Sequence, residues 1–393
     1  MIPTAEQLEF RALAREFAVG EIRPYAEAWD AERHLPEPLF ANLAELGFLG
    51  MRMPEAHGGL GLDTPTFVMV IEALAWGDAA VALAVAIHNG PIPRALEGWG
   101  SEEQQARWFP ELASGQVLGA FSLTEPGAGS DPSALATRAR ARDGGWVVDG
   151  RKSWVTNGDR AGLILLFART GADGSGREGI SAFLVPRTTP GLRVVDRERT
   201  LGMSASETVS LELDGVELPE DALLGSPGDG YEIAMDALLV GRIGVAAQAL
   251  GIGQAAFEHA LRYADEREQF GRSLHRFGAV REKLAEMAIR LRQVRLLTLD
   301  AATRLDQGQV EDQAHLPTSP RALSSMAKVA ASEAAMWVTD EAVQIFGGYG
   351  YMRDYPVERL MRDAKGTQIY EGANEVLRMA VAADAVREFE GRG

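Results

Sequence analysis

The stretch Ile369-Tyr370-Glu371-Gly372-Ala373-Asn374-Glu375-Val376-Leu377-Arg378 is where this sequence departs most clearly from a generic helical protein. Glu371 stands between an aromatic residue and a glycine, and a helical pattern resumes immediately after it. Glycine allows the backbone to approach a flat ligand closely, so the carboxylate of Glu371 can be held against one. On spacing alone, the alternative is a solvated carboxylate at a helix terminus.

The composition around this stretch is that of an ordinary globular protein. The chain has 393 residues, of which 46% are hydrophobic and 24% charged, and this length predicts two or three domains. The net charge of −17 argues against a general nucleic-acid or membrane-surface binder, although a local arginine pocket can still bind an anion. Cysteine is absent, which excludes disulfides and cysteine metal sites. The six histidines lack metal-ligand spacing, so we expect no metal.

Helical periodicity governs the chain up to about residue 117. Phe10, Leu13 and Phe17 recur at intervals of three and four residues, which places them on one helix face. Residues 66–87 are apolar nearly all round and predict a helix buried within a larger assembly. Ser101 precedes two glutamates and a glutamine, which predicts a helix N-cap.

Between residues 118 and 228 the pattern is typical of strands. Val209, Leu211 and Leu213 alternate with polar residues, and residues 163–168 and 180–185 are short apolar runs bounded by turn residues. This period of two predicts strands. Their short spacing predicts a small antiparallel barrel or sandwich.

The helical period returns from residue 229 onward. One helix seam is formed by Val280, Leu284, Met287, Leu291, Val294 and Leu297, whose spacing is typical of a helix packed in a bundle. Residues 267–277 and 307–320 are expected to interrupt the helices. Gly251-Ile252-Gly253 lies within the helical pattern and predicts close helix packing.

Segregated blocks of helices and strands argue for separate domains rather than an alternating parallel sheet. We therefore expect a mainly α protein with a middle β-domain. Its parts are an N-terminal helical domain (1–117), an antiparallel β-barrel or sandwich (118–228) and a C-terminal four-helix bundle (229–393). The N-terminus shows no signal peptide, and the longest apolar stretch, residues 79–87, is too short to span a bilayer. The expected location is cytoplasmic.

A second candidate stretch is Phe121-Ser122-Leu123-Thr124-Glu125-Pro126-Gly127-Ala128-Gly129-Ser130-Asp131. Its small residues, hydroxyls and backbone amides can cradle an anion or the edge of a polar heterocycle. It is not GxGxxG and no helix follows it, so a dinucleotide-binding turn is disfavoured. On the residues alone, a tight turn leading into a barrel is the favoured interpretation.

Together these motifs resemble the acyl-CoA dehydrogenases, flavoproteins that desaturate acyl-CoA thioesters. The resemblance extends over nearly the whole chain, including Ala44-Glu45-Leu46-Gly47-Phe48-Leu49-Gly50 and residues 353–378. It implies that Glu371 is the catalytic base and that FAD is the cofactor. In the family the thioester oxygen accepts hydrogen bonds from a flavin ribityl hydroxyl and from the backbone N–H of the catalytic glutamate, an oxyanion type of stabilisation.

The resemblance also assigns cofactor-binding residues. Thr124 would hydrogen-bond the flavin ring, Trp154 and Thr156 would cover one of its sides, and Arg267 would bind the pyrophosphate. The helix end at residues 344–348 would reach FAD held mainly by a neighbouring subunit. The implied set is Phe121, Leu123, Thr124, Gly129, Ser130, Trp154, Val155, Thr156, Arg267, Phe270, Gln344, Ile345, Gly347, Gly348, Ala373, Asn374 and Glu375. Alternatively, Trp154 is a core aromatic and Gly347 and Gly348 form a plain C-cap.

The implied acyl-CoA residues are Ser130, Arg242, Tyr370 and Gly372. Two positions depart from the family pattern: Gly278 replaces a glutamine and Leu239 replaces an aspartate, for which the nearby Asp236 is not a safe substitute. In the branch that includes isovaleryl-CoA dehydrogenases the base precedes the arginine, but here that residue is Gly241, which has no side chain. Glu371 is then the only matching base.

The resulting prediction is FAD-dependent α,β-dehydrogenation of an acyl-CoA to the trans-2-enoyl-CoA, as in fatty-acid β-oxidation. The resemblance further implies a homotetramer and an electron-transfer flavoprotein as the electron acceptor. Two alternatives remain. One is an acyl-CoA oxidase or related flavoenzyme that uses oxygen, and the other is a non-catalytic flavin-containing binding protein of the same fold.

Overall fold

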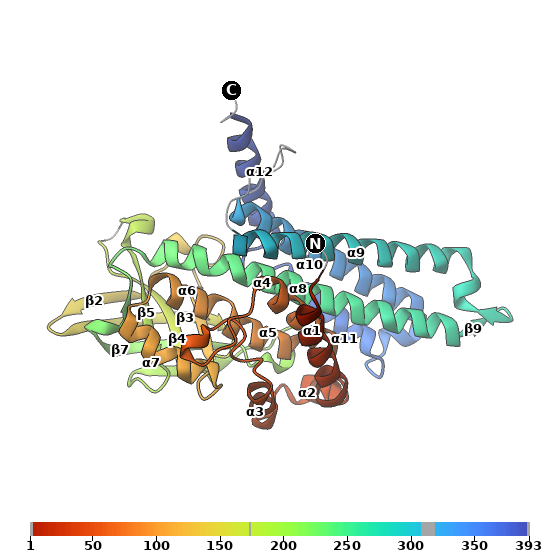
Figure 1. The fold of residues 1–393 in the computed structure, drawn as a ribbon, viewed down its shortest axis with the longest axis horizontal. Coiled ribbons are helices and arrows are strands. Elements are labelled where there is room, and N and C mark those ends of the chain that lie inside the picture. The colour runs from red at the N-terminus through yellow and green to blue at the C-terminus, as the bar shows by residue number, and fades with distance from the viewer. Residues whose placement is uncertain (1–2, 173, 308–318, 391–393) are drawn as a thin grey trace.

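The structure, a computed structural model, describes residues 3–172, 174–307 and 319–390. A helical block, a β-sheet block and a second helical block follow one another along the chain (Figure 1), which confirms the predicted fold class. Most of the predicted interruption at 307–320 lies outside the described residues.

Seven α-helices form the N-terminal block. They are α1 (Ala5–Phe17), α2 (Ala26–Glu32), α3 (Glu37–Glu45), α4 (Thr64–Gly77), α5 (Ala79–Asn89), α6 (Pro91–Trp99) and α7 (Glu102–Ala113), with a π-helical turn η1 (Ala18–Ile22) after α1. The predicted cap is confirmed, because the Ser101 side chain accepts from the N–H of Gln104 while the Gln104 side chain bonds back to Ser101.

The single helix predicted for residues 66–87 is wrong, because Asp78 divides it into α4 and α5. Asp78 has an extended backbone (φ −158°, ψ 133°), and its carboxylate accepts from the N–H groups of Ala80 and Val81. A buried aspartate therefore caps α5, and an aspartate that satisfies free N–H groups favours a new helix start over continuation. Both helices are buried along their full length.

The middle block contains eight strands that form one sheet in the order β6-β7-β3-β2-β4-β5-β8, with β1 also paired to β4. The strands are β1 (Gly119–Ser122), β2 (Arg138–Arg142), β3 (Gly145–Val155), β4 (Leu163–Arg169), β5 (Ile180–Pro186), β6 (Leu192–Arg197), β7 (Val209–Pro219) and β8 (Leu223–Leu224). Their pairings are antiparallel except for β1–β4 and β2–β4, which are parallel. Short 3-10 helices elsewhere are η2 (Glu55–His57), η3 (Pro132–Ala134), η4 (Gly176–Gly179), η5 (Ser204–Ser206), η6 (Glu220–Ala222), η7 (Leu274–Arg276) and η8 (Gly347–Tyr351).

Strand β4 explains why residues 163–168 are apolar without alternation. Leu163, Leu165 and Phe167 join a core cluster shared with α6, α7 and the start of α8. The intervening Ile164 and Leu166 join a separate cluster on the opposite face of the sheet. A strand buried on both faces has no polar side, so the sequence shows a continuous apolar run.

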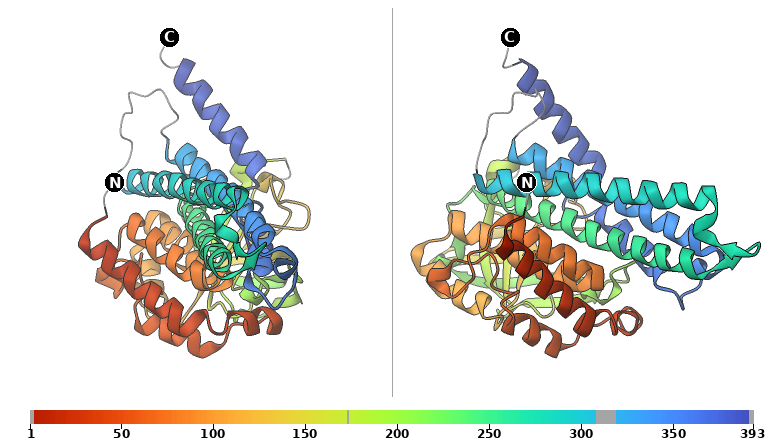
Figure 2. Two further views of the ribbon diagram at one scale, coloured as in Figure 1. Left: turned by 90° about the vertical axis from the view of Figure 1, so that its right-hand side faces the viewer. Right: turned by 45° about the vertical axis from the view of Figure 1, so that its right-hand side comes forward.

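The C-terminal block consists of long helices that run side by side and extend beyond the sheet (Figures 1 and 2). They are α8 (Gly230–Glu266), α9 (Gly278–Gln307) and α10 (Pro320–Phe346), with α11 (Pro356–Thr367) packed against them and α12 (Asn374–Glu390) leading to the C-terminus. A hairpin of β9 (Glu268–Gln269) and β10 (Arg272–Ser273) joins α8 to α9.

Helix α8 joins the two helical blocks into one core. A β-carbon on Gly251 would lie 2.3 Å from the carbonyl oxygen of Glu72 on α4, which confirms the close packing predicted at Gly251-Ile252-Gly253. By length and composition α8 could cross a membrane, but 83% of its most apolar window is buried inside the protein. That burial is typical of a core helix.

Candidate functional site

Glu371 lies in a strained turn between α11 and α12. Its φ of 53° and the φ of 101° at Gly372 place two consecutive residues in the left-handed region. A non-glycine residue in this region is held there by its surroundings and marks sites of function. The preceding Tyr370 is anchored to α8, because its hydroxyl donates to Oε1 of Gln248.

The carboxylate of Glu371 is buried, so the alternative of a solvated helix terminus is wrong. Its Oε2 is inaccessible and has no hydrogen-bond partner within the described residues. Burial raises the pKa of Glu371 to about 7, against the opposing charges of Arg242 and Lys328. A buried carboxyl group with a pKa near neutrality is suited to general-base chemistry.

Arg242 on α8 holds this turn from one side. Its Nε donates to the backbone carbonyl of Glu371 at 3.2 Å, and burial lowers the pKa of Arg242 to about 10. The preceding Gly241 leaves room for the carboxylate of Glu371, since a β-carbon at Gly241 would lie 2.2 Å from Oε2. Asp236 does not contact this turn: it forms a bidentate ion pair with Arg94.

The carboxylate faces a cavity of about 650 Å³. The expected site residues that line it come from four separate segments of the chain. They are Phe121, Leu123, Thr124, Gly129, Ser130, Trp154, Thr156, Arg242, Tyr370, Glu371 and Gly372. Leu83 and Ile87 of α5 and Met235 and Leu238 of α8 supply an aliphatic wall. Tertiary folding therefore gathers most of the candidate residues around one space.

The remaining candidates lie outside this cavity. Val155 is buried in the core of the sheet. Arg267 is the C-cap of α8, and Phe270 lies in the β9–β10 hairpin that follows. Gln344 and Ile345 lie at the end of α10, and Gly347 and Gly348 begin η8, where the Arg267 guanidinium stands 5.5 Å from the Tyr349 ring. The C-cap interpretation of Gly347 is compatible with its φ of 60°. Ala373 directly precedes α12, Asn374 and Glu375 begin it, and none of the three lines the cavity.

Trp154 is not a core aromatic. Its side chain is 61% exposed, and its φ of 58° falls at a register shift between β3 and β7. The irregularity turns the side chain out of the alternation that a regular strand would impose. The indole therefore lies at the mouth of the cavity, where it can cover a ligand.

The loop at residues 121–131 is held by a buried ion pair that sequence reasoning missed. Nζ of Lys152 lies 2.7 Å from Oε1 of Glu125 and donates to the carbonyl of Leu123 at 3.0 Å. Glu125 also accepts from the N–H groups of Ala136 and Thr137. Burial lowers the pKa of Lys152 to about 8. Although burial opposes its ionisation, Lys152 holds the pKa of Glu125 below the ordinary value.

A second missed lysine, Lys328 on α10, lies beneath the Glu371 turn. Its Nζ donates to the carbonyl of Gly372 at 2.8 Å and to Oδ1 of Asn374 at 2.9 Å. Lys152 and Lys328 are two of only four lysines in an arginine-rich chain. Their rarity is the one sequence feature that could have singled them out. The structure adds that both are paired, as a buried lysine must be because burial of an unpaired charge is costly.

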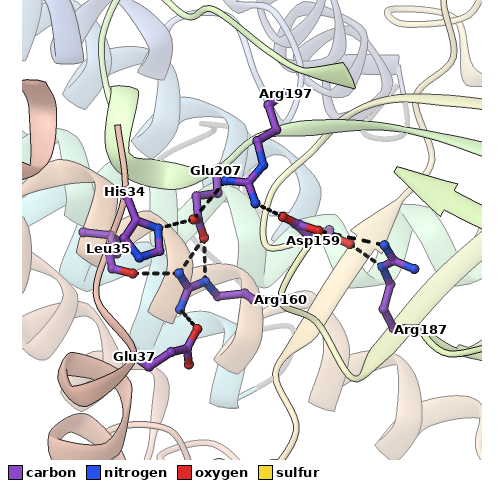
Figure 3. Close-up of polar contacts among 9 residues, drawn as sticks. His34, Leu35, Glu37, Asp159, Arg160, Arg187, Arg197 and Glu207 are labelled. Atoms are coloured by element: carbon purple, nitrogen blue, oxygen red, sulfur yellow. Dashed lines mark hydrogen bonds and ion pairs between the residues drawn. The ribbon is translucent and has the colours of Figure 1, made fainter. Parts of the chain in front are cut away.

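A polar network fixes the segment that follows Trp154 (Figure 3). Arg160 donates to Glu207 and to the carbonyl of Leu35, and pairs with Glu37. Nδ1 of His34 lies 2.5 Å from Oε1 of Glu207. The network ties the chain between α2 and α3 to two segments of the sheet domain that border the cavity.

The cavity fits FAD by its chemistry. Thr124 and Thr156 offer hydroxyl groups, Trp154 offers a flat face, and Gly127 and Gly129 have open space where a β-carbon would stand. In the part of the chain that the structure describes, no group of three or more His, Cys, Asp or Glu residues is placed to hold a metal ion. An organic cofactor and an acyl ligand are therefore the occupants that this site suits.

Three family models match successive parts of the chain. They describe the N-terminal, middle and C-terminal domains of acyl-CoA dehydrogenase, at residues 4–116, 120–216 and 228–386. An acyl-CoA dehydrogenase of Bacillus subtilis is 45% identical over 96% of this chain and 97% of its own length.

Two solved structures match closely. Butyryl-CoA dehydrogenase from Megasphaera elsdenii has a TM-score of 0.94 and 37% identity, covering 98% of this chain and 99% of its own. A chain of a structure described as "Electron transferring flavoprotein of Acidaminococcus fermentans: Towards a mechanism of flavin-based electron bifurcation" has a TM-score of 0.92 and 38% identity, covering 97% and 98%.

Proposed function

We propose that this chain, which belongs to the acyl-CoA dehydrogenase family, oxidises short-chain acyl-CoA thioesters with Glu371 as the catalytic base. The family is FAD-dependent and acts on CH–CH bonds. The assignment of the base depends on one observation: Glu371 lines the cavity, and its buried Oε2 has no hydrogen-bond partner among the described residues.

The proposed role of Glu371 follows from the chemistry of a thioester. The α-proton is weakly acidic, and a base whose pKa lies near the working pH is best placed to remove it. As the α C–H bond breaks, the proton passes to the carboxylate of Glu371, whose pKa burial raises to about 7. Bound FAD supplies the acceptor for the hydride of the β-carbon, which leaves a trans-2-enoyl thioester.

Two groups of this chain would prepare the carboxylate for that step. Arg242 fixes the backbone of Glu371 through its carbonyl, and Gly241 leaves the space that the carboxylate fills. Ser130 and Tyr370 line the same cavity and are proposed to contact the acyl-CoA. Because the base and the thioester would be held in a fixed geometry, proton transfer would not have to wait for a chance encounter, and this raises its rate.

The preference for a short acyl chain is supported by similarity and by lining. A structural relative at 37% identity is a butyryl-CoA dehydrogenase. The aliphatic wall of Leu83, Ile87 and Leu238 is suited to contact with a hydrocarbon chain. Fatty-acid β-oxidation is the context in which such a reaction is expected.

We also propose an electron-transfer flavoprotein as the electron acceptor. The exposed indole of Trp154 stands at the mouth of the cavity, which is a position that a docking protein could reach. The similarity to a chain of a structure described as an electron transferring flavoprotein supports the same proposal.

We also propose a homotetramer, because some of the expected cofactor-binding residues lie away from the cavity. Arg267, Phe270 and the end of α10 lie outside the cavity that holds the other candidates, and Phe270 is 94% exposed. A neighbouring copy would bring these residues to its own flavin, as the resemblance implies. Light scattering of the FAD-loaded protein measures the assembly, and a monomer that retains FAD would contradict the proposal.

The test of the reaction is an anaerobic titration of the FAD-loaded protein with straight, branched, dicarboxylic and aromatic acyl-CoAs, followed at the flavin absorption band. Bleaching by butyryl-CoA at lower concentrations than by the other thioesters is the expected result. Reoxidation by a carrier flavoprotein rather than by air separates a dehydrogenase from an oxidase. Absence of bleaching by every thioester would favour the non-catalytic alternative.

A further inference from the structure

Two buried cations from two different helices donate hydrogen bonds to the turn that carries Glu371. Arg242 on α8 donates to the carbonyl of Glu371 at 3.2 Å, and Lys328 on α10 donates to the next carbonyl, that of Gly372, at 2.8 Å. Helices α8 and α10 run alongside each other (Figures 1 and 2). The two donors therefore hold consecutive peptide groups of one turn against a rigid pair of helices.

Lys328 is itself fixed by a small network that the solvent does not reach. The side chain is fully buried, and its Nζ also donates to Oδ1 of Asn374 at 2.9 Å. Nδ2 of Asn374 in turn donates to Oγ of Ser332, one turn along α10 from Lys328, at 3.0 Å. Lys328 therefore bonds both to the Glu371 turn and to the first residue of α12.

These hydrogen bonds hold a part of the backbone that is strained. Glu371 and Gly372 both have positive φ, and a non-glycine residue in that region persists only when its surroundings over-determine it. A charged donor on a buried carbonyl forms a hydrogen bond about twice as strong as a neutral one. Removal of Lys328 would leave the Gly372 carbonyl buried without this donor, so the turn could relax and carry the carboxylate away from the cavity.

The charge of Lys328 also acts on the carboxylate of Glu371. Ionisable groups from several elements act on this pair or on its neighbours. Arg242 on α8, Glu333 on α10, Tyr370 before the turn and Glu375 on α12 act on the pair itself. Tyr231 on α8 and Arg321 on α10 act on Arg242, and Asp363 acts on Tyr370. Arg242 and Lys328 are the cations whose charge lowers the pKa of Glu371. Burial in turn lowers the pKa of Lys328 to about 7, so Lys328 carries this charge below that pH. A buried base that must be ionised to accept a proton benefits from both charges.

We propose that Lys328 is a positioning residue of the reaction: it holds the Glu371–Gly372 turn and, while protonated, supplies the second of two buried positive charges that favour the ionised form of the base. This inference rests on the proposed function, in which Glu371 removes the α-proton. Lys328 touches neither the cavity nor a reacting atom, so its effect is transmitted through Glu371.

A first test compares Lys328→Met, Lys328→Arg and Ser332→Ala by rapid mixing of the FAD-loaded proteins with butyryl-CoA across pH. Lys328→Met loses the charge at similar length, and we expect the midpoint of its rate–pH profile to move upward by on the order of one pH unit. Ser332→Ala removes a hydrogen-bond partner without changing charge, and Lys328→Arg keeps the charge, so both should retain the wild-type midpoint. A slower Lys328→Met enzyme with an unmoved midpoint would overturn the proposal.

A second test does not depend on turnover or on the folding of Lys328→Met. The chain has four lysines, Lys152, Lys283, Lys328 and Lys365, so selective carbon-13 labelling gives few signals to assign. In Glu371→Gln the negative partner of Lys328 is lost. Because the coupling between two titrating groups is mutual, the pH at the titration midpoint of the Lys328 signal should fall. The signal of Lys283, which pairs with Glu341, is the internal reference and should not move.

The outcomes separate the inference from the function on which it rests. An unmoved Lys328 midpoint in Glu371→Gln overturns the role assigned to its charge. A wild-type protein that no acyl-CoA reduces would instead overturn the proposed function. A fall in the Lys328 midpoint together with an upward shift of the Lys328→Met rate profile supports both parts of the proposal.

Discussion

Gly241 of α8 lies directly against the carboxylate of Glu371: a β-carbon at Gly241 would stand 2.2 Å from Oε2 and 2.7 Å from Cδ of Glu371. Real β-carbons do not approach other atoms so closely. The two residues are 130 positions apart in the sequence, yet the absence of a side chain at one creates the place that the other occupies. The position of the Glu371 carboxylate therefore depends on the glycine at position 241.

Gly241→Ala should displace the carboxylate of Glu371 while leaving the protein folded. Alanine is favoured over glycine within a helix by about 1 kcal/mol, but a misplacement of about 1 Å can cost about 10²-fold in rate. We expect flavin reduction by butyryl-CoA to slow by roughly that factor, as measured by anaerobic rapid mixing.

The matched control is Gly244→Ala, one turn further along α8. Its added β-carbon would meet the Phe67 ring at 3.4 Å, which is an ordinary contact. The control should gain the same helix preference and keep the wild-type rate. Equal rates in the two variants would contradict the idea that Gly241 makes room for the base.

Glu371→Gln should retain bound FAD and lose reduction by acyl-CoA. Removal of a general base costs about 10²–10⁴-fold, and glutamine cannot accept the α-proton. In the wild-type protein the rate should rise with pH through about 7, because burial raises the pKa of Glu371 to that value and only the ionised form is a base. Normal turnover in Glu371→Gln would refute the assignment.

His88 should make the protein sensitive to mild acid. The ring is fully buried; Nε2 lies 3.1 Å from the carbonyl of Leu112, and Nδ1 accepts from the N–H of Gly119. This pattern requires the neutral ring, and burial lowers the pKa of His88 to about 4 from 6.5. Between these values the unfolded chain binds a proton that the folded chain does not, so stability falls as pH falls.

The size of this effect is on the order of 3 kcal/mol, lost between pH 6.5 and about 4. Guanidinium denaturation of the wild type and of His88→Gln at a series of pH values measures it. The variant has no ring to titrate, so its stability should change less over this range. Parallel curves for the two proteins would show that His88 is not responsible.

Lys152→Met should destabilise the sheet domain and weaken FAD retention. The substitution leaves Glu125 buried without its cation, which typically costs about 3–5 kcal/mol. The loop that Lys152 holds through Leu123 would also loosen. Thermal unfolding and the FAD content after gel filtration are the measurements.

The double variant Lys152→Met/Glu125→Gln is the control for that prediction. It removes both charges, so the penalty of an unpaired buried carboxylate disappears and part of the stability should return. If the double variant is less stable than the wild type by the full sum of the effects of Lys152→Met and Glu125→Gln alone, the two residues are not coupled and the ion-pair argument fails.

Local patterns were sufficient for the order of the elements. The spacing of Phe10, Leu13 and Phe17, the alternation of Val209 and Leu211 and the cap at Ser101 all depend on neighbours within a few residues. The local pattern fails where it has two solutions: the apolar run of residues 66–87 predicts one helix, but Asp78 caps a second one. A buried capping aspartate within an apolar run has no periodic signature.

The residues of the site divide in the same way. By itself the sequence determined the family motifs, the helix–strand–helix order and Glu371 as the matching base. The folded structure was needed to show that this carboxylate is buried beside Gly241, that Trp154 faces outward, and that Lys152 and Lys328 are buried near the site. The reason is physical: burial and charge pairing depend on atoms brought together from distant parts of the chain, whereas periodicity and capping depend on neighbours along it.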